Sequence, residues 1–488
     1  MAPRRPGSVP LSLDAPGLPG INKEVVQLLS LAQPGHARTG GAQAAGPSSS
    51  NKSRLGGRFW QLWWATAVSS TGDGLVGMVA LPLLALTMTK SPLVIAGVTA
   101  TYRVAAAVAS LPAGLLTDRW DRRSLMVACN LMPGVVLAGL VVAMTLGAAD
   151  LAMVYASAIV ISACDVTYTL ALQAIFPDLV SSNDQLAVAN GRLMAVEGTG
   201  EQLVGPAAGG FLFGLARRAP FLADSVSFIA CAVFLRSLPS APSQVHALAG
   251  PGPGAATTNG AGPGGGPPAL HRKQKPSWWQ DLRTGFSMFN AKPPLKVLAA
   301  AMSAISFSQS MVLALLVIYC EHSLHLSPTG YGAFLAGASV LGLAGLYFGG
   351  AAQARMGAAG MVIAGVLACG LSYLGMSVAN LAVLGALAFG LQELGTTIAN
   401  VGSVTTRQQL IPREMYGRVG AVHRLFVVTS GPFGALAGGL IADAFGVRPA
   451  MLVAGAADVA VLVFLAPALR RHLPRRAPRS REPVAQAG

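Results

Sequence analysis

The chain has 488 residues, of which 53% are hydrophobic and only 11% charged, and its formal net charge is +15 at pH 7. A soluble protein would carry about 25% charged residues, so this composition excludes an ordinary soluble domain and favours a multi-pass membrane protein. The five cysteines lie in apolar runs without CxxC or Cys/His spacing, so we expect buried free thiols, and neither a disulfide framework nor a zinc site is indicated.

The first 58 residues are rich in Gly, Pro, Ala and Ser and lack the uninterrupted apolar segment of a signal peptide. We therefore expect residues 1–58 to form a disordered N-terminal tail. From Phe59 onward the chain is a series of apolar segments, each close to the length of about 20 residues that crosses a bilayer as a helix.

Twelve of these segments are predicted to be transmembrane helices, six on each side of a linker. The first six are 59–89, 92–117, 124–147, 150–176, 186–214 and 219–236. The last six are 294–320, 328–353, 358–378, 381–410, 415–443 and 447–469. Together they predict an all-α membrane protein with two six-helix bundles, 59–236 and 294–469, and a basic C-terminal tail at 470–488.

The segment between the two bundles, 237–293, is dominated by Gly and Pro over most of its length and cannot bury a core. Its last part changes character, because residues 278–289 have the periodicity of an amphipathic helix. We expect this helix to lie at the membrane surface, with an apolar face made of Trp278, Leu282, Phe286 and Phe289.

Lys and Arg residues are distributed unevenly between the two sides of the predicted membrane. If the N-terminus is cytoplasmic, most of the 34 basic residues fall in the tails, the linker and the connectors of the cytoplasmic side. The opposite side retains only Lys90, Arg217, Arg218 and Arg448, and Arg103 lies within a span. This asymmetry predicts that both termini are cytoplasmic, and it explains the basic composition without a nucleic-acid partner.

The two halves repeat each other in order along the chain. The stretch GLLTDRWD at 114–121 matches GAAQARMG at 350–357. In both halves a Gly-Arg pair precedes a Gly-Pro pair by the same spacing, with the Gly-Pro pairs at Gly205 and Gly431. An ordered set of matches indicates a duplicated six-helix unit, which is the architecture of carriers that alternate access by moving one half against the other.

Several stretches, LPAGLLTDRWDRRSLM, GPAAGG, FLADSVSF and IPREMYGRV among them, resemble the major facilitator superfamily. The chain from about 59 to 470 is most similar to the bacterial branch that holds macrolide-efflux and enterobactin-exporter proteins. The resemblance implies a plasma-membrane transporter that works by alternating access. We expect a monomer whose partners are a small-molecule substrate, protons and membrane lipids, with no cofactor and no metal.

The charged connector between the second and third spans carries the most specific part of this resemblance. Gly114 is expected to let two helices approach closely, and Asp118 to favour the positive end of the next helix. The resemblance implies a conformational latch; the alternative is a solvated loop that follows the positive-inside bias. Asp121 stands where the family commonly has glycine, and Ala354 replaces the carboxylate in the second copy. The latch residues would be Gly114, Asp118, Arg119, Arg122 and Arg123.

Glycine and proline are concentrated in the fifth span at Gly205, Pro206, Gly209 and Gly210. We expect them to bend or thin this helix and allow close contact with a helix of the other half. The resemblance associates this pattern with antiport, whereas generic helix packing is the alternative interpretation. The eleventh span repeats the beginning of the pattern at Gly431 and Pro432.

Ionisable residues inside the membrane cost about 2.5–3.5 kcal/mol each and are functional candidates. Counting about 1.5 Å per residue places Asp73 and Arg103 near mid-depth on consecutive helices, and we expect them to pair, as a structural ion pair or a proton-coupled switch. Glu197 and Glu201 share one helix face and disfavour simultaneous ionisation, which suits a proton carrier or a cationic substrate. A hydrogen-bonded structural acid is the alternative for any one of these carboxylates, which also include Asp165, Glu393 and Asp458.

Together, these features predict a proton-driven exporter of a small hydrophobic organic compound, such as an antibiotic, a drug or a siderophore. An uptake symporter or a uniporter of another solute is the first alternative, and a non-transporting membrane receptor or scaffold is the second. An enzyme is disfavoured because the sequence has no Walker loop, no zinc-protease helix and no Gly-x-Ser-x-Gly motif.

Overall fold

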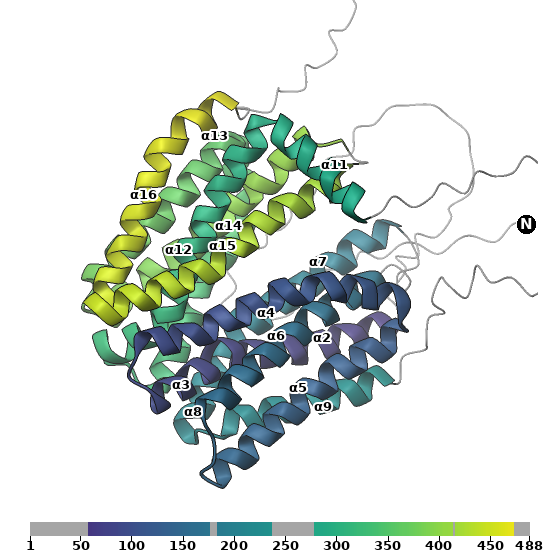
Figure 1. Cartoon of the computed structure of the whole chain (residues 1–488), viewed down its shortest axis with the longest axis vertical. Coiled ribbons are helices and arrows are strands. Elements are labelled where there is room, and N and C mark those ends of the chain that lie inside the picture. The colour runs from purple at the N-terminus through teal and green to yellow at the C-terminus, as the bar shows by residue number, and fades with distance from the viewer. Residues whose placement is uncertain (1–56, 176–182, 237–277, 413–414, 473–488) are drawn as a thin grey trace, which may run out of the picture. The chain divides into compact units, whose positions relative to one another are not determined.

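The computed structural model describes residues 57–175, 183–236, 278–412 and 415–472, all of which form helices or short connections between helices (Figure 1). Most of the predicted N-terminal tail, of the linker and of the C-terminal tail lies outside the described residues. The described part contains no strand. The expected all-α class and the division into two groups of helices are therefore confirmed.

The first half of the chain forms six spans. Two of them, the first and the fifth, are interrupted by a short π-helical turn. In chain order the elements are α2 (Gly57–Leu75), η1 (Val76–Ala80), α3 (Leu81–Met88), α4 (Pro92–Arg119), α5 (Arg122–Thr145), α6 (Leu151–Ile175), α7 (Asn183–Thr199), η3 (Gly200–Val204), α8 (Gly205–Leu215) and α9 (Ala219–Arg236).

The second half begins with the short helix α11, which matches the predicted amphipathic helix, and continues with six spans. The elements are α11 (Trp278–Ala291), α12 (Pro293–Ile318), η4 (Tyr319–Ser323), α13 (Pro328–Val378), α14 (Ala382–Leu410), α15 (Tyr416–Phe445) and α16 (Val447–His472). The long element α13 contains the eighth and ninth spans, which meet at Gly357, where a φ of 69° breaks the helix. Such a left-handed conformation is readily available to glycine.

Many helix boundaries follow from local chemistry. Pro92, Pro293 and Pro328 lie in the first turns of α4, α12 and α13, where the missing N–H costs no helical hydrogen bond. Asp121 is the N-cap of α5, and its Oδ2 accepts a hydrogen bond from the Ser124 N–H at 2.9 Å. This cap lies where the second copy of the repeat has Gly357, so the two copies turn the chain by different means.

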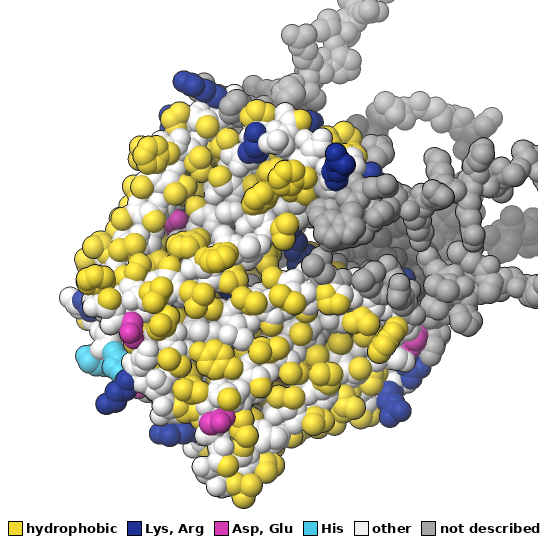
Figure 2. Space-filling view, in the orientation of Figure 1, with side chains coloured by type: hydrophobic (Ala, Val, Ile, Leu, Met, Phe, Trp, Pro, Cys, Tyr) yellow, Lys and Arg dark blue, Asp and Glu magenta, His cyan; other side chains and the backbone are white. Residues whose placement is uncertain are grey.

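Ten segments of the described part are long and apolar enough to cross a membrane. Hydrophobic side chains cover most of the described face in Figure 2, and Lys and Arg lie mainly near its margins. The segment α7–η3–α8 is not among the ten, and it carries Glu197 and Glu201 in its middle. With this segment and the first part of α13 included, the described part of the chain has the twelve spans of two six-helix bundles.

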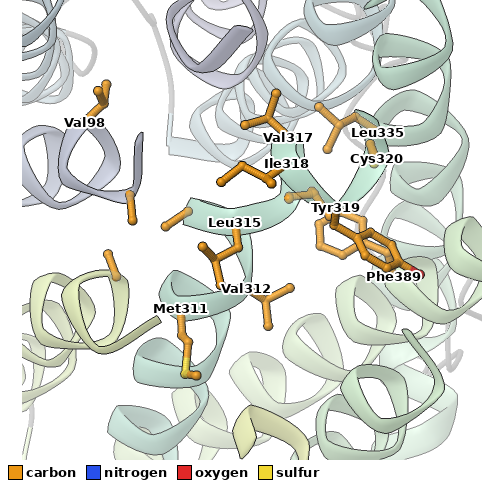
Figure 3. Packing of buried hydrophobic residues seen from close by; sticks show 14 of the residues in the cluster. Val98, Met311, Val312, Leu315, Val317, Ile318, Tyr319, Cys320, Leu335 and Phe389 are labelled. Atoms are coloured by element: carbon orange, nitrogen blue, oxygen red, sulfur yellow. The ribbon is translucent and has the colours of Figure 1, made fainter. Parts of the chain in front are cut away.

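Small residues let the helices of each half pack closely around a large apolar core. Figure 3 shows part of this core, with Met311, Leu315 and Tyr319 along α12 and η4 beside Leu335 of α13 and Phe389 of α14. In the first half, α8 packs on α2 through Gly209, where a Cβ would lie 2.7 Å from the Leu75 carbonyl oxygen. The packing of α8 on its own half therefore depends on a residue without a side chain.

We expect Gly209→Val to destabilise the first half by about 1–3 kcal/mol, because the added atoms meet backbone that cannot move aside. The matched control is Gly139→Val in α5, since a Cβ there would meet no heavy atom within 4 Å. Thermal unfolding of the purified variants measures the effect. Equal melting temperatures for the two variants would show that the contact at Gly209 does not limit stability.

Candidate functional site

Four of the predicted membrane carboxylates come together in the first half. The charged groups that interact electrostatically with Asp73 of α2 are all carboxylates: Asp165 of α6, Glu197 of α7, Glu201 of η3 and Asp224 of α9. Glu197 and Asp165 also interact electrostatically with Glu201, and the Glu197 interaction is the one expected from their spacing on one helix face. The sequence thus identified most members of a cluster that the fold assembles from separate helices.

Asp224 is the member that sequence reasoning missed. It lies only five residues after the start of α9, and its side chain is 1% exposed. Its Oδ1 packs against Gly72 and accepts a hydrogen bond from Ser227 Oγ at 2.8 Å. The signal that could have found it is its place in FLADSVSF, one of the stretches that carried the family resemblance.

The expected pair of Asp73 and Arg103 is wrong in this structure. No ion pair joins their described side chains, and Arg103 is absent from the charged groups that act on Asp73. Arg103 extends instead toward the second half, where a Cβ on Gly431 of α15 would lie 3.2 Å from its Cδ. Two residues on consecutive helices share a depth but face different neighbours, because residue counting predicts depth and not the rotation of each helix.

The two remaining carboxylates, Glu393 and Asp458, lie in the second half. Asp458 of α16 is 1% exposed, and its Oδ2 accepts a hydrogen bond from Ser308 Oγ at 2.8 Å. Glu393 of α14 packs against Gly342 of α13, where a Cβ would lie 3.1 Å from the Glu393 Cβ. Neither joins the cluster of the first half, so the predicted set of acids is divided between the two halves.

The two halves contact each other mainly at the ends that lie away from Arg236 and Trp278; we call these the far ends, and the opposite ends the linker ends. Ser91 Oγ, just before α4, donates a hydrogen bond to Asp443 Oδ1 near the end of α15 at 3.0 Å. The helices α4 and α15 lie side by side (Figure 1). Along them, a Cβ on Gly439 would lie 2.9 Å from the Leu93 Cα.

A second contact between the halves joins α8 to the start of α13 through two glycines. A Cβ on Gly210 would lie 2.8 Å from the Gly332 Cα, and a Cβ on Gly332 would lie 3.0 Å from the Gly210 Cα and closer still to the Pro206 carbonyl oxygen. The two backbones meet directly. Of the predicted glycines, Gly210 faces the other half, whereas Gly205 and Gly209 face α2 of their own half.

Two hydrogen bonds between the halves end on carbonyl oxygens that lie four residues before a proline. Pro206 has no N–H to donate to the carbonyl four residues earlier, and this carbonyl, on Gln202, accepts a hydrogen bond from Ser339 Oγ at 2.7 Å. Pro82 stands in the same relation to Met78, whose carbonyl accepts a hydrogen bond from the Tyr331 hydroxyl at 3.2 Å. Both interruptions of the first half thus present a carbonyl oxygen to α13.

The double variant Ser339→Ala with Tyr331→Phe is expected to weaken the far-end contact without disturbing either half. Each hydrogen bond contributes about 1 kcal/mol, so the loss of both shifts the balance between closed and open far ends by roughly thirtyfold. Spin labels at Leu215 and Phe445, both exposed at the far ends of different halves, report this balance as a distance distribution. The five native cysteines are buried. A distribution identical to that of the parent chain would contradict the prediction.

The predicted latch is only partly visible. The side chains of Asp118 and Arg119 lie outside the described residues. Arg122 Nη1 donates a hydrogen bond to the Ala174 carbonyl at 2.8 Å, at the end of α6 in the same half. The expected close helix approach at Gly114 is wrong here, because a Cβ would meet no heavy atom within 4 Å. Asp121, rather than a family glycine, caps the following helix.

The predicted surface helix α11 also contacts α15 of its own half. Phe289 is buried and stacks on Phe426 with ring centroids 5.4 Å apart, whereas Phe286 is exposed. The side chains of Trp278 and Leu282 lie outside the described residues. Among the described residues, no group of three or more His, Cys, Asp or Glu is arranged to hold a metal ion.

Solved structures of membrane transporters share this fold. A bacterial homologue of the human lysosomal transporter Spinster, in an inward-facing and unoccupied conformation, aligns with a TM-score of 0.65 at 14% identity, over 86% of this chain and 98% of that one. The nucleoside transporter NupG aligns with a TM-score of 0.63 at 10% identity, over 85% and 100% of the two chains. A bacterial homologue of the iron transporter ferroportin, also inward-facing, aligns with a TM-score of 0.56 at 17% identity, over 84% and 98%.

A search of curated proteins finds no match to the sequence. The sequence profile of the Major Facilitator Superfamily, in contrast, matches residues 62–307 and 298–487, which include nearly all the described helices. Transport, rather than enzymatic catalysis, is therefore the activity to which the fold and the profile point. The chain belongs to the Major Facilitator Superfamily.

Proposed function

We propose that the protein exports a small hydrophobic organic compound across the plasma membrane in exchange for protons. The observation that carries the proposal is the cluster of Asp73, Asp165, Glu197, Glu201 and Asp224. Among the described residues, all the charged groups that interact with Asp73 are carboxylates, and none is a basic side chain. Carboxylates held this close in a poorly solvated interior cannot all be ionised at once. Such a cluster can take up and release protons as its exposure changes.

The far ends of the halves are in contact, which favours an inward-facing state if the linker ends are cytoplasmic. The distribution of Lys and Arg supports that orientation, with residues 1–58, 237–293 and 470–488 on the cytoplasmic side. The Spinster and ferroportin homologues are themselves inward-facing. In this arrangement the bundles 59–236 and 294–469 form the two walls of a central path, and export requires the far-end contact to open.

Arg103 has a different part in this proposal. It is a basic residue of the first half that extends into the interface, beside Gly431 of the second half. Its guanidinium lies on α4, one of the two helices that slide or separate when the far ends open. We assign it to the interface between the halves and not to the proton-carrying cluster, which replaces the pairing expected from the sequence.

The experiment uses inside-out vesicles from a pump-deficient host that expresses the full chain. A susceptibility panel in the same host first identifies compounds whose toxicity the protein reduces. With the vesicle lumen acidified, adding such a compound should drive protons out of the lumen, seen as recovery of a pH-sensitive fluorophore. Uptake symport would give no such release, and a receptor or scaffold would give neither protection nor proton movement.

A further inference from the structure

A small pocket inside the first half contains mostly oxygen-bearing side chains. It lies among α2, α5, α6 and α9, and all its lining residues belong to the first half. The polar members are Ser69, Asp73, Asn130, Asp165 and Tyr168, and the remaining lining residues are Cys129, Pro133, Ile161 and Phe228. Two carboxylates and an uncharged amide thus border the same small pocket.

Asn130 presents an acceptor that no protein group satisfies. Its side chain is 1% exposed, and its Nδ2 donates a hydrogen bond to the Met126 carbonyl at 2.8 Å, which fixes the orientation of the amide. The Oδ1 atom is buried and has no hydrogen-bond partner. A buried acceptor without a hydrogen-bond donor costs about 1–3 kcal/mol in stability. The presence of such an acceptor on a residue that lines the pocket points to a ligand that interacts with its lone pairs.

The backbone of α5 adds a further oxygen beside the pocket. Pro133 has no N–H, so the carbonyl four residues earlier, on Cys129, lacks its normal helical donor. Both residues line the pocket. The Cys129 thiol is itself hydrogen-bonded to Cys164. Oxygen atoms are therefore the main lone-pair-bearing atoms that the pocket offers to a ligand.

Every described charged group that interacts with Asp73, one of the residues that line the pocket, is a carboxylate. Asp224 of α9, Glu197 of α7 and Glu201 of η3 all interact electrostatically with Asp73, and Glu197 also interacts with Asp165. Asp224 Oδ2 is buried and has no hydrogen-bond donor. A field of this sign, in a region of low dielectric, strongly favours a bound positive charge.

We propose that this pocket binds one small hard cation, Na⁺ or a divalent ion of similar size, through Asp73, Asn130 and Asp165. Oxygen-only donor sets of carboxylate, amide and hydroxyl groups suit alkali and alkaline-earth ions and not the softer transition metals. Ser69 and Tyr168 supply the hydroxyls. The bound ion neutralises part of the cluster and ties α2, α5 and α6 together, independently of the transported compound and of the direction of transport.

Thermal unfolding of the purified full chain tests the site. Titration with NaCl, KCl, CaCl₂ or MgCl₂ is compared with N-methylglucamine chloride at equal ionic strength, so that screening is constant. A cation that binds only the folded state raises the melting temperature in a saturable manner. A rise with Na⁺ identifies a sodium site, and a rise with Ca²⁺ or Mg²⁺ alone identifies a divalent site; either result supports the proposal.

Variants then locate the response. Asn130→Leu and Asp165→Asn should each abolish the cation-dependent rise, while Gln392→Leu, which removes a fully buried amide of the second half, should retain it. Binding of radioactive ²²Na⁺ or ⁴⁵Ca²⁺ to the parent chain, and its displacement by the unlabelled ion, gives the same answer if a variant fails to fold. The proposal is overturned if all four salts act alike and neither isotope binds saturably, or if both pocket variants respond as the parent does.

Discussion

Replacing Asp73 by Asn is expected to reduce proton-coupled export to background while leaving the protein folded. Four other carboxylates interact electrostatically with Asp73, and each of them lies on a different helical segment: α6, α7, η3 or α9. An amide of the same shape can neither release nor take up a proton, so the cycle loses its exchange step. Proton release from inside-out vesicles on addition of a protected compound measures the effect.

The control for this variant is Asp150→Asn, which changes an exposed aspartate of the same half. Asp150 accepts a hydrogen bond from the Met153 N–H at 2.9 Å near the start of α6, outside the carboxylate cluster. It should retain export with no more than a small loss of stability. Full proton release by the Asp73→Asn protein would remove Asp73 from the coupling mechanism and leave it a structural role.

The second large effect is expected from Gly332→Val at the far end. The new side chain would meet the backbone of Gly210 and Pro206, which belong to the opposite half. Overpacking of this kind costs about 1–3 kcal/mol, which disfavours the closed far end by roughly 5- to 150-fold. Because each half keeps its own core, the protein should fold but export slowly.

Gly337→Val is the matched control, since it adds the same side chain to the same helix where a Cβ would meet no heavy atom within 4 Å. The distance between spin labels at Leu215 and Phe445 should lengthen in the Gly332 variant and stay unchanged in the control. Slow export with an unchanged label distance would mean that Gly332 acts by another route than far-end closure.

The sequence predicted the helices well because their signals are local. Apolar length located the spans, and the repeat of Gly-Pro pairs at Gly205 and Gly431 indicated the duplicated bundle. The chain turns at Asp121 and Gly357, where a side-chain cap and a left-handed glycine perform the same task. These features depend on a few neighbouring residues, so they can be read without knowing how the helices pack.

The candidate site was harder to predict because it depends on helix rotation. Depth along a helix suggested that Asp73 and Arg103 meet, yet one faces the carboxylates of its own half and the other faces Gly431 across the interface. Asp224 was missed for the same reason, since its burial comes from packing against Gly72 and not from its position along α9. The unpartnered acceptor of Asn130 likewise becomes evident only when α5 is placed among its neighbours.

The prolines of the first half have a role between the halves that the sequence alone does not reveal. Pro206 predicts a bent fifth span from sequence alone, whereas Pro82 is not part of the sequence prediction. Only the structure pairs the carbonyls of Met78 and Gln202 with Tyr331 and Ser339 of α13. The interruption therefore serves contact between the halves as well as helix geometry.

The central claim, that the two halves alternate between contact at the far ends and contact at the linker ends, is tested by two label pairs in one protein reconstituted in lipid. Leu215 and Phe445 report the far ends, and the exposed residues Trp120 and Gly417 report the linker ends. On addition of an exported compound under a proton gradient, the first distance should lengthen as the second shortens. Two distances that stay fixed during active export, or that change in the same direction, would contradict the account.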